Sequence, residues 1–139
     1  MKSLKILSVM FLAAMLAFSA CKKDDDPPLA VEISGLAISD SNTVITVTFN
    51  QGVYGNAEKT TGLDATSFQL VIYSTNQVTA SYQAVHVAGE ATAIIEITYE
   101  DELTGGEEIE IIALANKVFG EEGNALGADS SKKIEVINP

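Results

Sequence analysis

Hydrophobic and polar residues alternate along most of the chain after residue 30, and helical periodicity is nearly absent. In the range 43–50, Ile45, Val47 and Phe49 fall on one face of an extended chain, and polar residues fall on the other. Such one-sided alternation is typical of half-buried antiparallel strands. It predicts seven strands, at Val31–Ile38, Thr43–Asn50, Ser67–Tyr73, Val78–Val87, Ala91–Glu100, Glu108–Ala113 and Lys133–Ile137.

The spacing of these strands indicates the fold class. Seven short strands over about 100 residues, separated by turn-forming clusters, are typical of an all-β, immunoglobulin-like antiparallel sandwich. The chain has no tryptophan and no cysteine after residue 21, so it lacks both the buried tryptophan and the inter-sheet disulfide of antibody domains. A closed antiparallel barrel is the alternative architecture. We expect one domain, residues 31–139, which has to be stabilised by its apolar core without disulfides.

The first 20 residues have the composition of a secretory signal peptide. Lys2 and Lys5 precede an uncharged stretch that ends at Ala20, and small residues come directly before Cys21, the only cysteine of the chain. This order of basic, apolar and small residues is typical of a cleaved signal. A spanning helix needs about 20 apolar residues, and this stretch is shorter. A soluble secreted protein would share the signal but would leave Cys21 as a free thiol.

Cysteine directly after the small residues makes residues 1–21 resemble a bacterial lipoprotein signal, although Phe18 stands where that signal usually has Leu, Val or Ile. The resemblance implies that residues 1–20 are removed and that Cys21 carries the lipid and begins the mature chain. Residues 21–30 would then be the lipidated cysteine and an acidic, proline-containing tether, about 30 Å long when extended.

The location that this implies is the cell envelope, with the domain held to a membrane by the lipid on Cys21. The run Lys-Lys-Asp-Asp-Asp after Cys21 also resembles the acidic tags that direct some Gram-negative lipoproteins to the outer face of the outer membrane. We therefore expect an outer-membrane, surface-exposed protein. A plain solvated spacer is the alternative reading of the charged run.

The chain is strongly acidic, with a formal net charge of −11, which becomes −13 when Lys2 and Lys5 leave with the signal (−11 − 2). It contains no arginine. Nucleic-acid binding depends on Lys and Arg side chains that neutralise phosphates, so this balance argues against a nucleic-acid partner. It also argues against electrostatic binding to an anionic membrane, and it is compatible with cations, basic partners or simple solubility.

Three short segments add a resemblance to a known family. Thr43–Tyr54 reads TVITVTFNQGVY, Leu63–Phe68 reads LDATSF, and Ala115–Asp129 reads ANKVFGEEGNALGAD. In this order they resemble an early strand, a strand entry and a late loop of the bacterial Ig-like repeats found in surface-layer and secreted adhesive proteins. The resemblance covers about residues 31–138, and it implies a sandwich fold with an adhesive or accessory role.

No residue pattern indicates catalysis. His86 is the only histidine, no G-x-S-x-G nucleophile elbow is present, and the sequence offers no second candidate base. One histidine and one cysteine do not supply the ligands that a zinc site takes. Most of the acidic pairs fall at strand ends and on solvent faces, where charge protects sheet edges. We therefore expect neither an enzyme nor a cofactor.

Two hypotheses for binding sites remain. Calcium binds six to eight oxygen ligands, which acidic loops gathered at the ends of a sandwich could supply, although no EF-hand spacing is present. An exposed tyrosine, Tyr54 or Tyr73, could stack on a sugar or a peptide, although the preference of aromatic residues for cores favours burial. The loop residues considered for calcium are Asp40, Asn42, Glu121, Glu122, Asn124 and Asp129.

The function that fits these observations best is a non-catalytic, lipid-anchored Ig-like module that presents a binding or adhesive surface to an extracellular protein or glycan. The alternative is a small structural or accessory subunit of a larger outer-membrane or periplasmic complex, for example one that handles polysaccharide. In that case an added edge strand would be the natural mode of contact. The sequence does not indicate an oligomeric state.

Overall fold

The computed structural model describes residues 27–138. In this part of the chain the only helical element is one turn of 3₁₀ helix, η1 (Ala65–Ser67), and no helix is long and apolar enough to cross a membrane. The all-β prediction is confirmed. The strands are β1 (Ile33–Ile38), β2 (Val44–Phe49), β3 (Phe68–Tyr73), β4 (Ala80–Val85), β5 (Thr92–Tyr99), β6 (Glu108–Ala113) and β7 (Ser130–Glu135).

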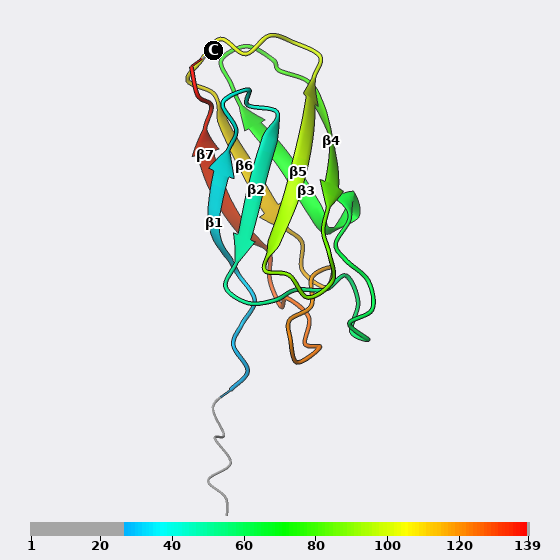
Figure 1. Cartoon of the computed structure of the whole chain (residues 1–139). Helices are drawn as coiled ribbons and strands as arrows, with labels where there is room; N and C mark the ends of the chain where they lie inside the picture. The colour runs from blue at the N-terminus through cyan, green and yellow to red at the C-terminus, as the bar shows by residue number, and fades with distance from the viewer. Residues whose placement is uncertain (1–26, 139) are drawn as a thin grey trace, which may run out of the picture.

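The strands form two antiparallel sheets that pack face to face (Figure 1). One sheet has four strands in the order β1-β2-β5-β4, and the other has three in the order β3-β6-β7. This order is the one found in constant-type immunoglobulin domains. The chain therefore forms an immunoglobulin-like sandwich, and the alternative of a closed barrel is wrong because the two sheets remain separate.

Alternation along each strand produces the core between the sheets. In β2 the buried residues are Ile45, Val47 and Phe49, as the sequence pattern predicts, and in β6 Ile109 and Ile111 are fully buried. Phe68 packs against Phe49 with ring centroids 6.4 Å apart, so two phenylalanines contribute to a core that contains no tryptophan. The domain is thus held together by an aliphatic and phenylalanine core without a disulfide.

The last strand begins three residues earlier than the sequence pattern predicts. β7 starts at Ser130 rather than Lys133, because Ser130 and Ser131 pair with Ala113 and Ile112 of β6. Two consecutive serines have the composition of a turn, and only the neighbouring strand makes them part of a sheet. The strand also ends earlier, at Glu135.

Because the strands alternate in direction, the loops divide between two ends of the sandwich. Residue 27 enters at one end, here called the N-terminal end, which also carries the β2–β3, β4–β5 and β6–β7 loops (Figure 1). The opposite, C-terminal end carries the β1–β2, β3–β4 and β5–β6 loops together with the segment that follows β7.

A buried asparagine closes the C-terminal end. Asn42, in the β1–β2 turn, has a φ of 60° and is only 3% exposed. Its Nδ2 donates a hydrogen bond to the carbonyl oxygen of Ile137, and its Oδ1 accepts one from the Ile137 N–H, each at 2.8 Å. Tyr99 Oη donates to the carbonyl oxygen of Asn42 at 2.8 Å. This arrangement, the Asn42 clamp, ties the chain after β7 to the turn between the first two strands.

Candidate functional site

The six residues considered for calcium fall into two groups at opposite ends of the sandwich. Asp40 and Asn42 lie in the β1–β2 turn at the C-terminal end, whereas the other four lie in the β6–β7 loop at the N-terminal end. Within residues 27–138, no group of three or more His, Cys, Asp or Glu residues is placed to hold a metal ion. The structure therefore does not bring the six together.

Several of these oxygens already bind backbone N–H groups. Both polar atoms of the Asn42 side chain bind Ile137. Asp129 Oδ1 accepts a hydrogen bond from Ala115 N at 2.7 Å, and Glu121 Oε1 accepts one from Gly52 N at 3.3 Å. These side chains have a structural role, because they satisfy loop N–H groups that would otherwise lack a protein partner.

His86, which directly follows β4, also has a structural role. Its Nδ1 accepts a hydrogen bond from Leu63 N at 3.0 Å, and its Nε2 lies 2.9 Å from the carbonyl oxygen of Glu90. The neutral tautomer with the proton on Nε2 satisfies both contacts. The ring therefore links the end of β4 to two loops of the N-terminal end.

Tyr54 is half-buried among these same loops. Its backbone exchanges two hydrogen bonds with Phe119, each at 2.9 Å, and Lys59 Nζ lies 6.0 Å from the centroid of its ring. Its hydroxyl lies close to Gly89, where a φ of 88° favours glycine. Tyr54 thus packs the N-terminal loops against one another rather than standing out from them.

Tyr73 is the exposed aromatic residue of the two. It ends β3 on the outer face of the three-stranded sheet, and 43% of its surface is exposed. The expectation that it is buried is wrong, because β3 turns Phe68 toward the core and every second residue from Gln69 to Tyr73 outward.

Three charged side chains from the neighbouring strands surround the Tyr73 ring. Tyr73 Oη donates a hydrogen bond to Glu110 Oε2 at 2.6 Å, and Lys133 Nζ lies 3.9 Å from the ring centroid. Lys133 also forms an ion pair with Glu108 at 3.3 Å. We call Tyr73, Glu108, Glu110 and Lys133 the Tyr73 cluster.

The hydrogen bonds of the cluster shift the pKa values of its members. The bond to Glu110 raises the pKa of the Tyr73 phenol, and the same bond lowers the pKa of the Glu110 carboxyl. The bond to Glu108 raises the pKa of Lys133. These shifts keep Tyr73 neutral, Glu110 ionised and Lys133 protonated at neutral pH. The cluster thus places a fixed aromatic ring and three charged groups together on an exposed face.

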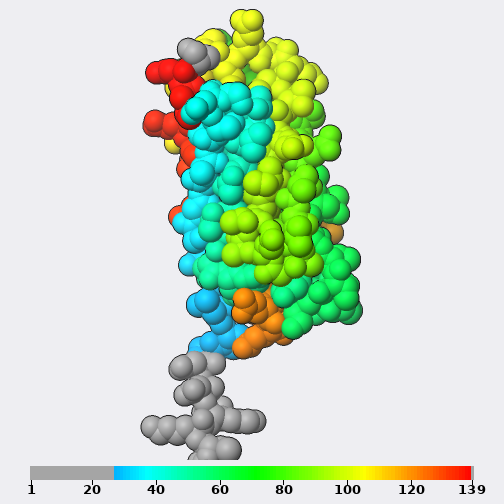
Figure 2. Space-filling model, in the orientation of Figure 1, coloured from blue at the N-terminus to red at the C-terminus, as the bar shows by residue number. Residues whose placement is uncertain are grey.

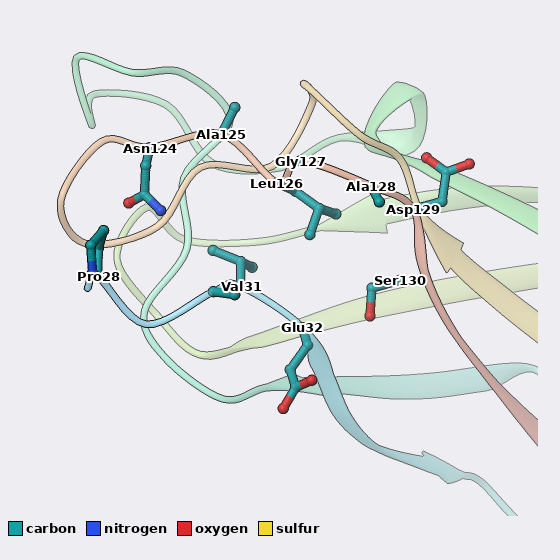
Figure 3. A pocket seen from close by; sticks show the side chains of 11 residues that line it. Pro28, Val31, Glu32, Asn124, Ala125, Leu126, Gly127, Ala128, Asp129 and Ser130 are labelled. Carbon is teal, nitrogen blue, oxygen red and sulfur yellow. The ribbon is translucent and has the colours of Figure 1, made fainter. Parts of the chain in front are cut away.

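A cleft of about 520 Å³ opens at the N-terminal end, between the chain entering β1 and the β6–β7 loop (Figure 3). Val31 and Leu126 lie within it, and both are largely buried. Ser130 Oγ, at its edge, accepts a hydrogen bond from Ile33 N at 2.9 Å. Backbone and small side chains from Asn124 to Ala128 form one wall. The cleft lies between the chain entering β1 and the last loop, and the bond from Ile33 N to Ser130 Oγ links its two sides.

Comparison with known protein families, with curated proteins and with solved structures finds no match to this chain. The residues themselves therefore carry the functional argument. Cys21 and the signal lie outside the described residues, so lipid attachment remains a prediction from sequence.

The sequence could have indicated that Tyr73 is exposed, because the inward position of Phe68 fixes the phase of β3. The charged partners of Tyr73 come from β6 and β7, and the local sequence around Tyr73 does not predict them.

Proposed function

We propose that this protein is a non-catalytic lipoprotein of the cell envelope that presents one Ig-like module for binding or adhesion at the cell surface. The observation that carries the proposal is the Tyr73 cluster, an exposed aromatic ring held by three charged neighbours on an open sheet face. The sequence of residues 1–30 supports the anchor and the location.

A fixed tyrosine is a favourable contact for a ligand. Tyrosine offers a large, rigid and amphipathic surface, and it loses little conformational entropy when it binds. Here the contacts to Glu110 and Lys133 hold the ring in one orientation in the free protein. The ring therefore loses less conformational entropy when a ligand binds. The carboxylates and the ammonium group beside the ring can bond hydroxyl or amide groups, which suits a glycan or the polar surface of an extracellular protein.

The anchor follows from the chemistry of a lipidated cysteine. One acyl chain binds a bilayer only marginally, at about 0.8 kcal/mol per buried methylene, whereas two or more chains bind firmly. A diacylated Cys21 would therefore hold the domain permanently. The acidic tether after it would keep the sandwich away from the membrane, because like charges extend a linker.

Whole cells that carry the full chain test the proposal. Binding of wild-type, Tyr73→Ala and Gln69→Ala cells to immobilised glycans and extracellular proteins would be compared, with surface display checked by protease shaving. We expect the Tyr73 variant to lose about tenfold or more in affinity, as for a contact worth more than ~1.4 kcal/mol. Gln69 is exposed on the same strand outside the cluster, and its variant should bind like wild type.

Two results would count against the proposal. If Tyr73→Ala cells bind every wild-type ligand equally well, the cluster is not the binding site. If a stoichiometric partner stays with the protein after membranes are solubilised and no ligand is found, an accessory subunit of a larger complex describes it better.

A further inference from the structure

Charge is distributed unevenly between the two sheets. Within the bounds of the four strands of the β1-β2-β5-β4 sheet, Glu96 is the only charged residue, and this sheet faces the viewer in Figure 2. The three-stranded sheet carries five charged residues, two in β6 and three in β7. In sequence, residues 65–89 contain no Asp, Glu, Lys or Arg, although the whole chain has 8 basic and 19 acidic residues.

The uncharged segment 65–89 builds β3 and β4, which are both edge strands. On β3 the carbonyl oxygen of Phe68 accepts a hydrogen bond from Tyr82 Oη at 2.7 Å, so part of that edge is occupied. β4 pairs with β5 over six consecutive residues without a bulge, and in residues 27–138 no strand pairs with its other edge. Glu100 N, directly after β5, donates a hydrogen bond to Thr79 O. The backbone groups of Thr79 therefore point toward the β5 side. Because bonding alternates along an antiparallel pair, the backbone groups of Ala80, Tyr82 and Ala84 point away from β5.

The free part of this edge is short and defined. At its end, Gly62 lies against the carbonyl oxygen of His86, and Leu63 N donates to the His86 ring. The open backbone groups are therefore those from Ala80 to Ala84.

The edge strands on the other side of the sandwich are protected. β1 has a register shift between Ile33 and Gly35, and its first residue is tied to β7 through Ser130. β7 carries Lys132 and Lys133, of which Lys132 stands opposite the fully buried Ile111. Bulges and inward lysines are common means of preventing edge-to-edge pairing. β4 has neither, and it has no proline.

We propose that β4 pairs antiparallel with β4 of a second copy of this chain, about a two-fold axis through Tyr82. Ala80 then stands opposite Ala84 of the other copy, and the three outward residues of each strand exchange about six backbone hydrogen bonds. The two four-stranded sheets become one continuous sheet.

The lack of charge favours a second copy over a basic partner. A basic peptide is normally recognised by acidic residues at the contact, because opposite charges guide association, and β4 has none. Two copies of a strongly acidic chain repel each other least where both contact surfaces are uncharged. Glu96, the only acid within these four strands, would be at least three strand spacings, about 14 Å, from its counterpart. That distance exceeds the screening length of about 8 Å at physiological salt.

A cysteine pair tests both the contact and its register. In the proposed pairing Ser81 stands opposite Gln83 of the other copy, with Cα atoms about 4.5 Å apart, within disulfide range. Two Ser81 residues would be about 8 Å apart, which is too far. Full-length Ser81→Cys and Gln83→Cys chains, mixed in detergent solution under mild oxidation, should give a disulfide-linked dimer.

Three samples serve as controls for the cross-link. Each cysteine chain alone should give little dimer, and the wild-type chain reports any background from Cys21. Thr92→Cys mixed with Gln83→Cys should give none, because Thr92 is exposed on β5 rather than at the free edge. Absence of the Ser81–Gln83 cross-link, or equal yield with the Thr92 control, would overturn the proposal.

Charged variants test the same register without a covalent bond. Two differently tagged full-length copies would be co-precipitated from detergent extracts. Ser81→Glu with Gln83→Glu places like charges opposite each other and should reduce recovery about tenfold. Ser81→Glu with Gln83→Lys places opposite charges there and should restore it. Equal recovery of the Glu–Glu and the Glu–Lys variants would contradict the pairing. The pairing would also be contradicted if the protein cross-linked at β4 were an unrelated protein rather than a second copy of this chain.

Discussion

Replacement of Asn42 tests whether the clamp at the C-terminal end stabilises the whole sandwich. Alanine at this position removes both hydrogen bonds to Ile137, each worth about 1 kcal/mol net. The β-carbon at a φ of 60° is present in asparagine and in alanine alike, so its steric cost does not change. We therefore expect Asn42→Ala to lower the free energy of unfolding by about 2 kcal/mol. Domains of this size are stable by only about 5–15 kcal/mol in total, so this loss is large.

Glycine separates the hydrogen bonds from the backbone conformation. Asn42→Gly loses the hydrogen bonds but also removes the β-carbon that is unfavourable at positive φ, so we expect a loss of only about 1 kcal/mol. Asn116 provides the matched control, because it has the same φ of 60° but is exposed. The difference between the alanine and glycine variants should therefore be similar at the two positions, about 1 kcal/mol.

Urea unfolding followed by circular dichroism, on the chain from residue 22 onward, gives these free energies. For Asn42→Ala the melting temperature should fall by roughly 8 °C, given about 4 °C per kcal/mol. The reasoning is refuted if Asn42→Ala changes stability by less than about 0.5 kcal/mol, as an ordinary surface substitution would. It is also refuted if Asn42→Asp is as stable as wild type at neutral pH, because aspartate has no amide to donate to Ile137 O.

Three further predictions concern titration and metal. Hydrogen bonds from Thr104 and Gly105 lower the pKa of buried Glu107, so its contribution to stability is present above the ordinary pKa of 4.5 and is lost as pH falls through the lowered value. Glu107→Gln should therefore flatten the acid limb of stability measured between pH 2 and 6, and an unchanged limb would contradict this. Burial, with the charge of Glu107, raises the pKa of Tyr99 to about 12. Stability from Tyr99 is complete below pH 10 and is lost toward pH 12, and the ultraviolet titration of wild type minus Tyr99→Phe should show a midpoint near 12 rather than 10. Because the six calcium candidates divide between two ends, neither calcium nor a chelator should shift the melting temperature by more than about 1 °C, and a larger rise with calcium would restore the site.

The sequence predicts the strands well where alternation is regular. β2, β5 and β6 lie within their predicted segments, because one face of each is buried and the period of two is unbroken. β7 was harder to delimit, since Ser130 and Ser131 belong to the sheet only through their pairing with β6. Local composition cannot carry that information.

Side-chain roles were less predictable than strands. Asn42 has the composition of an ordinary turn residue, and its role depends on Ile137, which is 95 positions away. The separation of the calcium candidates, by contrast, follows from counting strands, because successive loops of an antiparallel sandwich alternate between its ends. Tyr73 lies between these cases, since its exposure follows from the phase of β3 whereas its charged neighbours depend on the strand order β3-β6-β7.

If Cys21 carries the proposed lipid, the end at which residue 27 enters determines how paired copies face the membrane. Antiparallel pairing inverts one sandwich relative to the other, so the two lipid anchors would leave in opposite directions. Neighbours in one bilayer could pair only if a tether ran back along a whole sandwich. Copies on two facing bilayers would have their anchors in these opposite directions. Many weak pairs acting together would then hold adjoining cells at a fixed spacing.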